Sequence, residues 1–582
     1  MKLGRHIRYL QSAIRNSHSA FGTRREFFNK MLAFGGLATF APFGKEPSGR
    51  GKDFFPKITD SPQTKRITSG PLLDWFYVHA GYVNYKSGFA ERWDVPEGIE
   101  IAVQPAEKSE ALIVPDRPWE KQGIGYTSGT YFRDGRYTMH YFSYLGFHCI
   151  AESDDGFHWT KPHLGLVEFE GSKKNNILYK GPAAVGHMFE DPSASPEERF
   201  KLVGVKGGMY DQLLDSDGHP VLLGNEFSRN FELQETLKEK YRGKWGQLKA
   251  FVVGAVSPDG LHWTDIRRPL LAEFCDGDNI VHYDKGLRKY VGYLRFHVAG
   301  RRCVGRSEMD DFRNFNPETV VLQADALDPP DTSIYHHAYT RYPGREDLHL
   351  MFPSMWHQSR DNMDIQLAVS HDGFHWTRPD RTTPIISNGV PGSNDGGCIY
   401  VGPGLLDLPD GRWAATYWGT HELHNVYDTD PVPKTRPSGT VRYAMWKRDR
   451  LAGIRAREFG RFTLRQDRFR AGENCPDAIE APPNNRFPPL SDPQEPPRQL
   501  KLNYKTEVGG WIRIELITFV GSMPYPQIPA IVGFSFSDCD VLTGDDVEKV
   551  VTWKGKSNTA RLSDSLAVRV EMYKATLFSF SL

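Results

Sequence analysis

The chain has 582 residues, and its 72 lysines and arginines are balanced by 72 aspartates and glutamates. A formal net charge of zero provides no global field for nucleic acid or an anionic membrane surface, so we expect neither as a partner. No stretch of the sequence is long and apolar enough to span a bilayer. The six cysteines are scattered without metal-ligand spacing, so a disulfide framework is not expected, although one or two bridges stay open.

The N-terminal segment has the features of a targeting sequence rather than of a folded domain. Arg24 and Arg25 precede a pair of phenylalanines and then a weakly apolar run at 31–41. This order resembles a bacterial twin-arginine export signal, and a basic, unstructured tail is the alternative. We predict a signal segment over 1–45, a linker over 46–68, and an exported protein that is periplasmic or extracellular.

The most informative feature of the remaining chain is a phrase that occurs three times. The pattern Ser-x-Asp-Gly-x-His-Trp-Thr stands at 153–160, 257–264 and 370–377, and each copy follows a strand-like run. Asp-Gly favours a tight turn because glycine adopts a positive φ without steric cost. We therefore expect β-hairpins whose own tryptophan folds back over the turn, and structural roles for the recurring histidine and tryptophan.

Two degenerate copies, at 302–312 and 442–450, bring the number of units to five. Ahead of each unit stands a second recurring phrase, a turn followed by a strand rich in tyrosine and valine. Four short strands per unit, repeated radially, are typical of a propeller. We predict a five-bladed β-propeller over 69–460, and we place Asp74 in an outer strand that closes the ring.

The sequence beyond the propeller changes in character. A proline-rich loop at 482–497 is followed by segments, from Leu500 to Phe580, in which apolar and polar residues alternate. This alternation and spacing predict a β-sandwich over 461–582. The only good helix candidate is at 232–241, so the fold class is all-β: a five-bladed β-propeller followed by a C-terminal β-sandwich.

A propeller followed by a sandwich resembles the five-bladed glycoside hydrolases of the family 32/43-like superfamily, in particular an exported bacterial group. The phrases that carry this resemblance stand at 117–120, 151–162, 164–166, 174–177, 190–192, 197–201, 305–307, 537–540, 544–545 and 551–555. The chain departs from the invertases in lacking their Trp-Met-Asn-Asp-Pro and Glu-Cys motifs. The resemblance therefore implies the architecture and leaves the reaction open.

Glycoside cleavage needs two carboxyl groups that flank the scissile bond. By the resemblance, the first three blades supply these acids to a funnel on the propeller axis, which assigns Glu120, Asp191 and Asp278 as catalytic. Each has a plainer reading: an ion pair with arginine for Glu120, a turn cap for Asp191, and an Asp-Gly turn for Asp278. Asp191 and Pro192 resemble the Arg-Asp-Pro motif of the invertase family, but this chain has Glu190 where that motif has arginine.

Other polar and aromatic residues stand at similar places in the repeats. Sugars stack on aromatic faces and are fixed by a few polar groups, so this mixture suits a carbohydrate pocket. We predict the following substrate-binding residues: His187, Asp276, Arg295, Asp331, His336, Trp356, Asp395 and Trp418. We predict no catalytic metal and no cofactor; the pair His421 and His424 is a weak signal, and a structural metal ion in the channel stays open.

We therefore predict a glycoside hydrolase that cleaves a furanoside or a polysaccharide side chain with paired carboxylates, on an oligo- or polysaccharide substrate. A non-catalytic carbohydrate-binding propeller and a sialidase-like enzyme are alternatives. A glycoside phosphorylase is a third, for which Arg295, Arg301 and Arg306 are candidates to bind phosphate. Dependence on phosphate separates phosphorylase from hydrolase.

Overall fold

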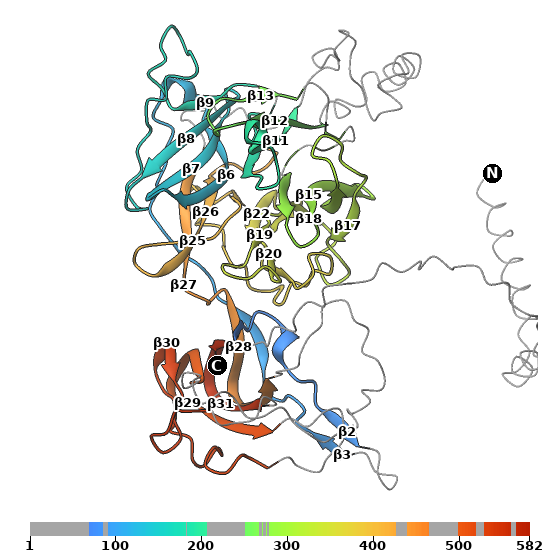
Figure 1. Cartoon of the computed structure of the whole chain (residues 1–582), viewed down its shortest axis with the longest axis vertical. Coiled ribbons are helices and arrows are strands. Elements are labelled where there is room, and N and C mark those ends of the chain that lie inside the picture. Colours follow the sequence, from blue (N-terminus) through green and yellow to red (C-terminus); the bar gives the residue numbers. More distant parts are fainter. Residues whose placement is uncertain are drawn as a thin grey trace, which may run out of the picture. The chain divides into compact units, whose positions relative to one another are not determined.

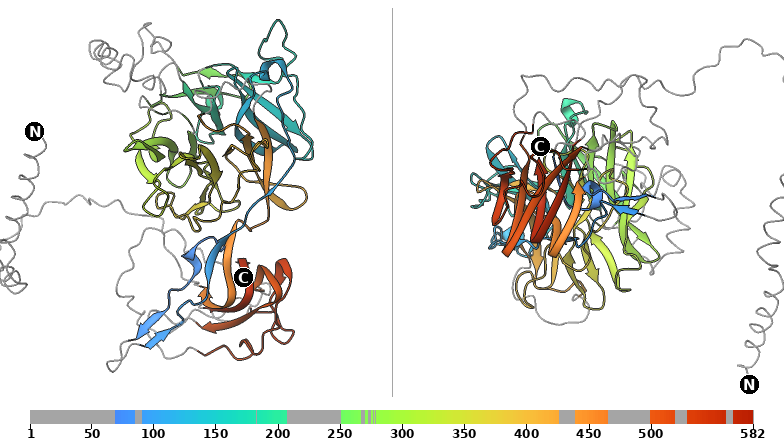
Figure 2. Two further views of the ribbon diagram at one scale, coloured as in Figure 1. Left: turned by 180° about the vertical axis from the view of Figure 1, so that it is seen from behind. Right: turned by 90° about the horizontal axis from the view of Figure 1, so that it is seen from below.

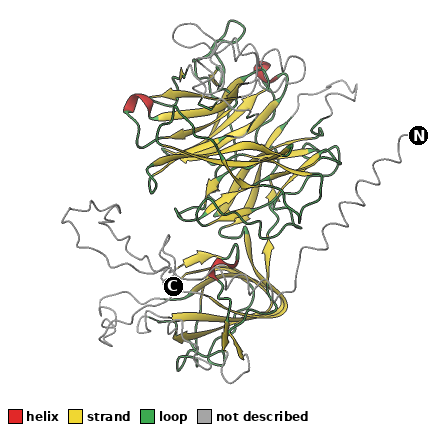
Figure 3. Cartoon of the chain, turned by 90° about the vertical axis from the view of Figure 1, so that its right-hand side faces the viewer, coloured by secondary structure: helices red, strands yellow, loops and turns green. Residues whose placement is uncertain are grey.

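The computed structural model describes residues 69–84, 91–181, 183–206, 251–266, 270–271, 275, 277, 279–425, 439–464, 499–518, 529–559 and 566–581. Almost every regular element in these ranges is a strand (Figure 3). The predicted signal segment, the linker and the helix candidate at 232–241 lie outside the described residues. No helix among the described residues is long and apolar enough to cross a membrane. The five described cysteines are buried free thiols.

The first three repeats each form one antiparallel sheet in which the strands follow one another in chain order (Figure 1). The strands of blade 1 are β6 (Ile124–Arg133), β7 (Arg136–Ser143), β8 (Phe147–Ser153) and β9 (Ile177–Tyr179). Those of blade 2 are β10 (Gly186–Glu190), β11 (Phe200–Lys206), β12 (Phe251–Ser257) and β13 (Thr264–Asp265). Those of blade 3 are β14 (Ile280–Asp284), β15 (Lys289–Val298), β16 (Arg301–Met309) and β17 (Thr319–Leu322).

The fourth repeat has the same plan, but its strands are interrupted. Its elements are β18 (Thr332–His336), β19 (Thr340–Arg341), β20 (His349–Met351), β21 (Ser354–His357), β22 (Asn362–Ile365) and β23 (Ala368–Ser370). Pro353 separates β20 from β21, since a proline cannot donate to a strand ladder. A parallel bridge from Met363 to Cys398 joins this blade to the next.

Blade 5 is completed by the N-terminal part of the chain. Its strands are β24 (Cys398–Val401), β25 (Leu406–Asp407), β26 (Arg412–Thr420), β27 (Thr440–Lys447) and β5 (Glu107–Lys108). Because β5 pairs with β27, strands from both ends of the propeller sequence close the ring. The predicted five-bladed β-propeller is confirmed, but the closing strand is β5. The placement of Asp74 was wrong: its carboxylate caps the short 3-10 helix η1 (Trp75–Tyr77).

The three full copies of the repeated phrase form the same turn. In the first copy, Asp155 Oδ1 accepts hydrogen bonds from the backbone N–H groups of Phe157 and His158, both at 2.8 Å. Its Oδ2 contacts His158 Nδ1 at 2.6 Å. The backbone hydrogen bonds and the imidazole hold the pKa of Asp155 below its usual range. The same contacts recur around Asp259 and Asp372, so these histidines are structural, as expected.

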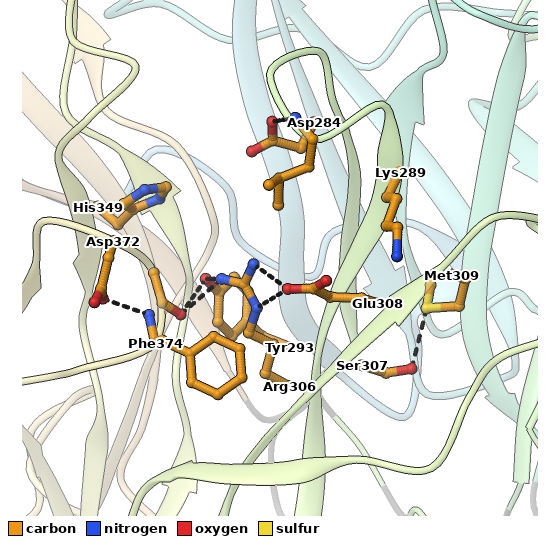
Figure 4. Close-up of polar contacts among 12 residues, drawn as sticks. Asp284, Lys289, Tyr293, Arg306, Ser307, Glu308, Met309, His349, Asp372 and Phe374 are labelled. Carbon is orange, nitrogen blue, oxygen red and sulfur yellow. Dashed lines mark hydrogen bonds and ion pairs between the residues drawn. The ribbon is translucent and has the colours of Figure 1, made fainter. Parts of the chain in front are cut away.

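The glycine of this turn also links neighbouring blades. The Gly373 carbonyl accepts hydrogen bonds from Tyr293 Oη (2.8 Å) and from Arg306 (2.8 Å) of blade 3, and from the turn's own Trp376 (3.2 Å). Figure 4 shows the Arg306 guanidinium between Tyr293 and Glu308, beside the turn of Asp372 and Phe374. The Gly156 carbonyl accepts an equivalent bond from Tyr443 of blade 5. The turns therefore connect the sheets to one another.

Most of the strands that do not belong to the blades form one further antiparallel sheet. The sheet has six strands: β1 (Ser69–Pro71), β4 (Glu100–Val103), β28 (Ala452–Leu464), β29 (Lys501–Thr518), β30 (Asp545–Val550) and β31 (Leu566–Ser581). In the lower body of Figure 1 and in the right-hand view of Figure 2, the long strands lie side by side. The hairpin of β2 (Tyr82–Asn84) and β3 (Glu91–Trp93) stands apart from this sheet.

This sheet differs from the expected sandwich in two ways. Its described strands pair into one sheet rather than two, with β29 and β31 bent at bulges near residues 506–511. It also includes β1 and β4, which the sequence analysis assigned to the propeller. β1 joins the sheet by pairing with β31, and β4 joins it by pairing with β28. Leu72, Trp553 and Phe580 belong to the apolar core that packs against these strands.

The close packing at the blade-linking glycine gives a first prediction. A Cβ on Gly373 would lie 2.5 Å from Arg306 and 2.6 Å from Tyr293, whereas one on Gly411 would meet nothing within 4 Å. Both glycines have a positive φ, 71° and 81°. We expect Gly411→Ala to lower the free energy of unfolding by about 1 kcal/mol through backbone strain, and Gly373→Ala to lower it by several kcal/mol more. Urea unfolding measures both, and equal losses would contradict the link between blades.

Candidate functional site at the propeller axis

The first strands of the blades surround a cavity on the propeller axis. Its volume is about 430 Å³, and every blade contributes to its lining. Tyr131 comes from β6, His187 from β10, His282 from β14, Arg341 from β19, and Gly404 from the segment after β24. His187, predicted as a substrate-binding residue, therefore lies on the axis.

A chain of hydrogen bonds leads from this cavity into blade 1. Tyr131 Oη lies 2.5 Å from His140 Nε2, His140 Nδ1 lies 2.8 Å from His148 Nε2, and His148 Nδ1 lies 3.1 Å from the Ala184 carbonyl. Burial lowers the pKa of His148 to about 4 and that of His140 well below its usual value. Both imidazoles are therefore neutral near pH 7.

The carbonyl at the end of this chain fixes the direction of every bond in it. A carbonyl only accepts, so His148 donates from Nδ1 and accepts at Nε2. His140 then donates from Nδ1, which leaves its Nε2 to accept the phenol proton of Tyr131. The chain runs Tyr131 to His140 to His148 to Ala184, and it holds the Tyr131 proton away from the cavity.

A second polar cluster lines the cavity from blades 3 and 4. Tyr339 Oη lies 2.9 Å from His349 Nδ1 and 3.4 Å from His282 Nε2, and the His282 ring stacks on Tyr339. Arg341 donates to Asp284 at 2.6 Å, so its charge is compensated. Burial, with the charge of Arg341 nearby, lowers the pKa of His282 to about 3 and of His349 to about 4. This part of the axis offers hydrogen-bonding groups with little net charge.

Nearer the start of the inner strands, aromatic rings from three blades meet. Tyr126 of blade 1 stacks on His336 of blade 4 and lies 5.0 Å from Tyr400 and 5.5 Å from Trp418 of blade 5. Tyr335 lies 5.6 Å from Tyr400. We call this group the aromatic cluster. It comprises Tyr126, Tyr335, His336, Trp356, Tyr400 and Trp418, of which Tyr126 and Tyr335 are half-buried.

Two arginines of blade 3 lie on this cluster. The guanidinium carbons of Arg295 and Arg302 lie 4.1 and 4.8 Å from the centre of the Tyr335 ring. Arg302 also lies 5.2 Å from Trp356. The structure therefore brings together Arg295, His336, Trp356 and Trp418, four of the predicted substrate-binding residues.

The other two candidate arginines have structural contacts. Arg301 donates to the carbonyls of Thr332 and Pro330. Arg306 is buried and bonded to Tyr293, Glu308 and the Gly373 carbonyl. Neither side chain joins the aromatic cluster.

The carboxylate of Glu120 is fully engaged within blade 1. Oε2 accepts from the backbone N–H groups of Asp116 (3.0 Å) and Arg117 (3.1 Å) and from Lys161 Nζ (2.7 Å). Oε1 accepts from Tyr141 Oη at 2.6 Å. The side chain has no exposed surface. These contacts correct the catalytic assignment: Glu120 closes a turn ahead of β6 and cannot reach a substrate.

Asp191 is likewise buried, and it lies at the far end of its strand. It follows β10, so it stands at the opposite end of the inner strands from Glu120. Its carboxylate accepts from Ser193 Oγ (2.6 Å) and Tyr290 Oη (2.6 Å), and Lys201 Nζ lies 3.8 Å away. The plainer reading, a turn cap that links blades 2 and 3, describes these contacts. The structure does not bring Glu120 and Asp191 together.

The remaining predicted acids divide into two groups. Asp331 accepts from the backbone N–H and the hydroxyl of Ser359, and so caps the turn between β21 and β22. Asp395 accepts from Lys108 Nζ (2.8 Å) and Tyr417 Oη (3.0 Å), and ties the ring-closing strand to blade 5. Asp276 and Asp278 lie outside the described residues. No group of three or more potential ligands for a metal ion occurs in the described part of the chain.

Sequence reasoning missed several residues of the axis: Tyr126, Tyr131, His140, His148, His282, Tyr335, Tyr339, Tyr400 and Arg302. A signal was present for some of them. Tyr131 stands just before the first recurring Asp-Gly turn, so it belongs to an inner strand. His140 and His148 carried no such signal, because only the pairing of β7 with β8 brings their rings together.

No family model and no curated protein matches the sequence. Several solved structures match the fold weakly. A thermostable family-43 glycoside hydrolase is 14% identical, with a TM-score of 0.34 over 56% of this chain and 88% of that chain. The catalytic domain of the Coprinopsis cinerea GH62 α-L-arabinofuranosidase is 12% identical, with a TM-score of 0.34 over 59% and 97%. An N-acetylgalactosamine deacetylase from F. plautii is 15% identical, with a TM-score of 0.34 over 66% and 96%. The fold assignment rests on the strand pairings given above.

The contacts of Glu120 predict a loss of stability on substitution. Glu120→Gln would leave the Lys161 ammonium, 7% exposed, without its buried counter-charge. Breaking a buried pair from one side costs about 3 kcal/mol or more, so we expect that fall in the free energy of unfolding. Asp116→Asn is the matched control, because Asp116 binds the same ammonium with a side chain that is 50% exposed, and it should cost about 1 kcal/mol or less. Comparable losses in the two variants would refute the structural role of Glu120.

The neutral histidines of the axis predict a pH dependence. His148 has a folded-state pKa of about 4 against a usual value of 6.5, so between these values the unfolded chain binds more protons. The contribution of His148 to the free energy of unfolding is constant above about pH 6.5. By pH 4 its protonation in the unfolded chain lowers that free energy by about 3 kcal/mol. We expect the free energy of unfolding to fall over this range, and His148→Gln to reduce the slope. A slope equal to that of wild type, or reduced as much by His158→Gln in an exposed turn, would contradict the assignment.

Proposed function

We propose that this protein cleaves glycosidic bonds in a saccharide bound at the aromatic cluster. The observation that carries the proposal is the meeting of Tyr126, Tyr335 and Trp418, from three blades, around one axis with Arg295. Sugar rings present C–H faces that stack on aromatic side chains, while their hydroxyls need a small number of fixed polar partners. The half-buried Tyr126 and Tyr335 offer such faces.

A buried donor within the aromatic cluster and a second one at the start of the first strand of blade 3 support the same proposal. Trp418 is 4% exposed, and its indole N–H has no hydrogen-bond partner in the described part of the chain. Asn279, immediately before β14, is also 4% exposed, and its amide nitrogen has no hydrogen-bond partner among the described residues. Buried donors of this kind are costly unless an acceptor satisfies them. A hydroxyl oxygen of a bound saccharide is an acceptor of the required type.

The catalytic carboxyl group of this proposal is Asp278. Glu120 and Asp191 have all their oxygens engaged elsewhere, so the paired-carboxylate assignment in its original form is withdrawn. Asp278 directly precedes Asn279 in the sequence, with Asp276 two residues earlier. A carboxyl that protonates the leaving group, or deprotonates the attacking one, contributes about 10² to 10⁴-fold to the rate.

Phosphorolysis is a second candidate, and the two arginines favour it. Arg295 and Arg302 place two guanidinium groups on the Tyr335 ring. Arginine binds phosphate oxygens in bidentate geometry, and a phosphorylase needs only one carboxyl group because phosphate itself is the nucleophile. Phosphorolysis is therefore compatible with a single catalytic aspartate.

Hydrolysis and phosphorolysis are separated by one set of assays. A panel of aryl furanosides, aryl pyranosides and polysaccharides is incubated with and without inorganic phosphate, using wild type, Asp278→Asn and Asp310→Asn. Asp310 is the matched control because its side chain is 85% exposed. We expect release of free sugar, or of sugar phosphate only when phosphate is present, and a loss of about 10² to 10⁴-fold in Asp278→Asn alone.

Two outcomes would contradict the proposal. Saturable glycan binding with no turnover under either condition would make the protein a carbohydrate-binding propeller. Turnover that survives in folded Asp278→Asn would place the chemistry on other residues. Circular dichroism of each variant establishes that the fold is retained.

A further inference from the structure

The axial cavity is distinct from the aromatic cluster. Tyr126 stands near the start of β6, whereas Gly129, Thr130 and Tyr131, which line the cavity, stand further along the same strand. None of the aromatic cluster residues lines the cavity. Its volume of about 430 Å³ lies within the range of roughly 300–1,000 Å³ that is typical of small-molecule sites. The cavity therefore needs an explanation separate from glycoside cleavage.

Tyr131 presents a hydrogen-bond acceptor of fixed orientation. Its proton is held by neutral His140, whose own tautomer is fixed through His148 by the Ala184 carbonyl. The phenol oxygen thus keeps its lone pairs for a donor. Three groups in series, His140, His148 and the Ala184 carbonyl, fix the orientation of this one hydroxyl.

His282 provides a second hydrogen-bonding atom. Its Nε2 faces Tyr339 Oη at 3.4 Å, while its Nδ1 is buried and has no hydrogen-bond partner within the described ranges. An imidazole nitrogen buried without a partner costs free energy that a ligand hydroxyl would recover. Because His282 lines the cavity and is neutral, this atom suits an uncharged ligand.

Charge in the lining also disfavours an ionic ligand. Arg341 is paired with Asp284 at 2.6 Å, and the lining also contains one further residue of each sign, the exposed Lys285 and Glu346. The rings of Tyr131, Tyr283 and Tyr339 supply aromatic surface. Neutral donors and acceptors with aromatic faces are the groups that recognise polyhydroxylated molecules.

We propose that the axial cavity is a second ligand site, for a neutral polyhydroxylated molecule of about monosaccharide size, in which Tyr131 accepts and His282 Nδ1 completes its hydrogen bonding. The inference rests on the cavity alone and does not depend on glycoside cleavage at the aromatic cluster.

Isothermal titration calorimetry of the full chain tests this site. The probes are glycerol, xylose, arabinose, glucose, mannose and inositol, with phosphate and acetate as anionic probes. We expect one neutral probe to bind with 1:1 stoichiometry. Tyr131→Phe, which removes only the hydroxyl, should weaken binding tenfold or more. Tyr137→Phe is the matched control, because that hydroxyl donates to the Asp407 carbonyl away from the cavity.

A second variant tests the site independently in case Tyr131→Phe does not fold. His282→Phe keeps a ring that can stack on Tyr339 but removes both nitrogens, and it should also weaken binding tenfold or more. The proposal is overturned if no neutral probe binds, if only the anions bind, or if both variants bind as wild type. Asp278→Asn should abolish cleavage without changing this affinity, so failure of the cleavage proposal leaves a result distinct from failure of the second site.

Discussion

Hydrogen bonds to the glycine carbonyl of the repeated turn join blade 3 to blade 4 and blade 5 to blade 1. A blade of four short strands cannot bury both its faces alone, so its stability depends on contact with the next blade. The bond from Tyr293 to the Gly373 carbonyl, and its counterpart from Tyr443 to Gly156, join the central strand of one blade to the turn of its neighbour. Because the aspartate beneath each turn fixes the backbone through two N–H groups, the carbonyl points outward at a set position. The converging first strands, and with them the axis, depend on this geometry.

The same need to satisfy buried polar groups explains why the acids most prominent in the sequence are structural. A carboxylate without exposed surface is tolerated only when each oxygen has donors, and Glu120 has four. A catalytic carboxyl group must instead keep an oxygen for the substrate. Burial that completes hydrogen bonding therefore argues against catalysis, whereas burial that leaves an atom without a partner, as for His282 Nδ1 and Trp418 Nε1, argues for a ligand.

Much of the fold could be predicted because turns are encoded locally. The Ser-x-Asp-Gly phrase contains every group that its own hydrogen bonds require, so its three copies, with two degenerate copies and the strand phrase ahead of each unit, identified the five blades. Ring closure by β5 could not be predicted, because two residues, Glu107 and Lys108, carry no periodic signal. Asp191 was predicted at the start of an inner strand, but it follows the end of β10. The Glu-Asp-Pro phrase indicates that a strand begins or ends there, and it does not distinguish the two. His187 lies in the first strand of its blade and lines the cavity, whereas Trp356 and Trp418 reach the aromatic cluster from the second strands of blades 4 and 5, which the sequence pattern did not indicate.

The axis carries different chemistry along its length. At the aromatic cluster, Arg295 and Arg302 bring positive charge onto aromatic faces, which suits recognition of a saccharide or of phosphate. In the cavity, Arg341 is neutralised by Asp284, and the histidines are kept neutral by burial. A ring of strands that run beside one axis can hold both environments a few residues apart along their length. The tyrosines of β6 illustrate this: Tyr126 joins the aromatic cluster, whereas Tyr131, further along the strand, lines the cavity while its proton is held by His140.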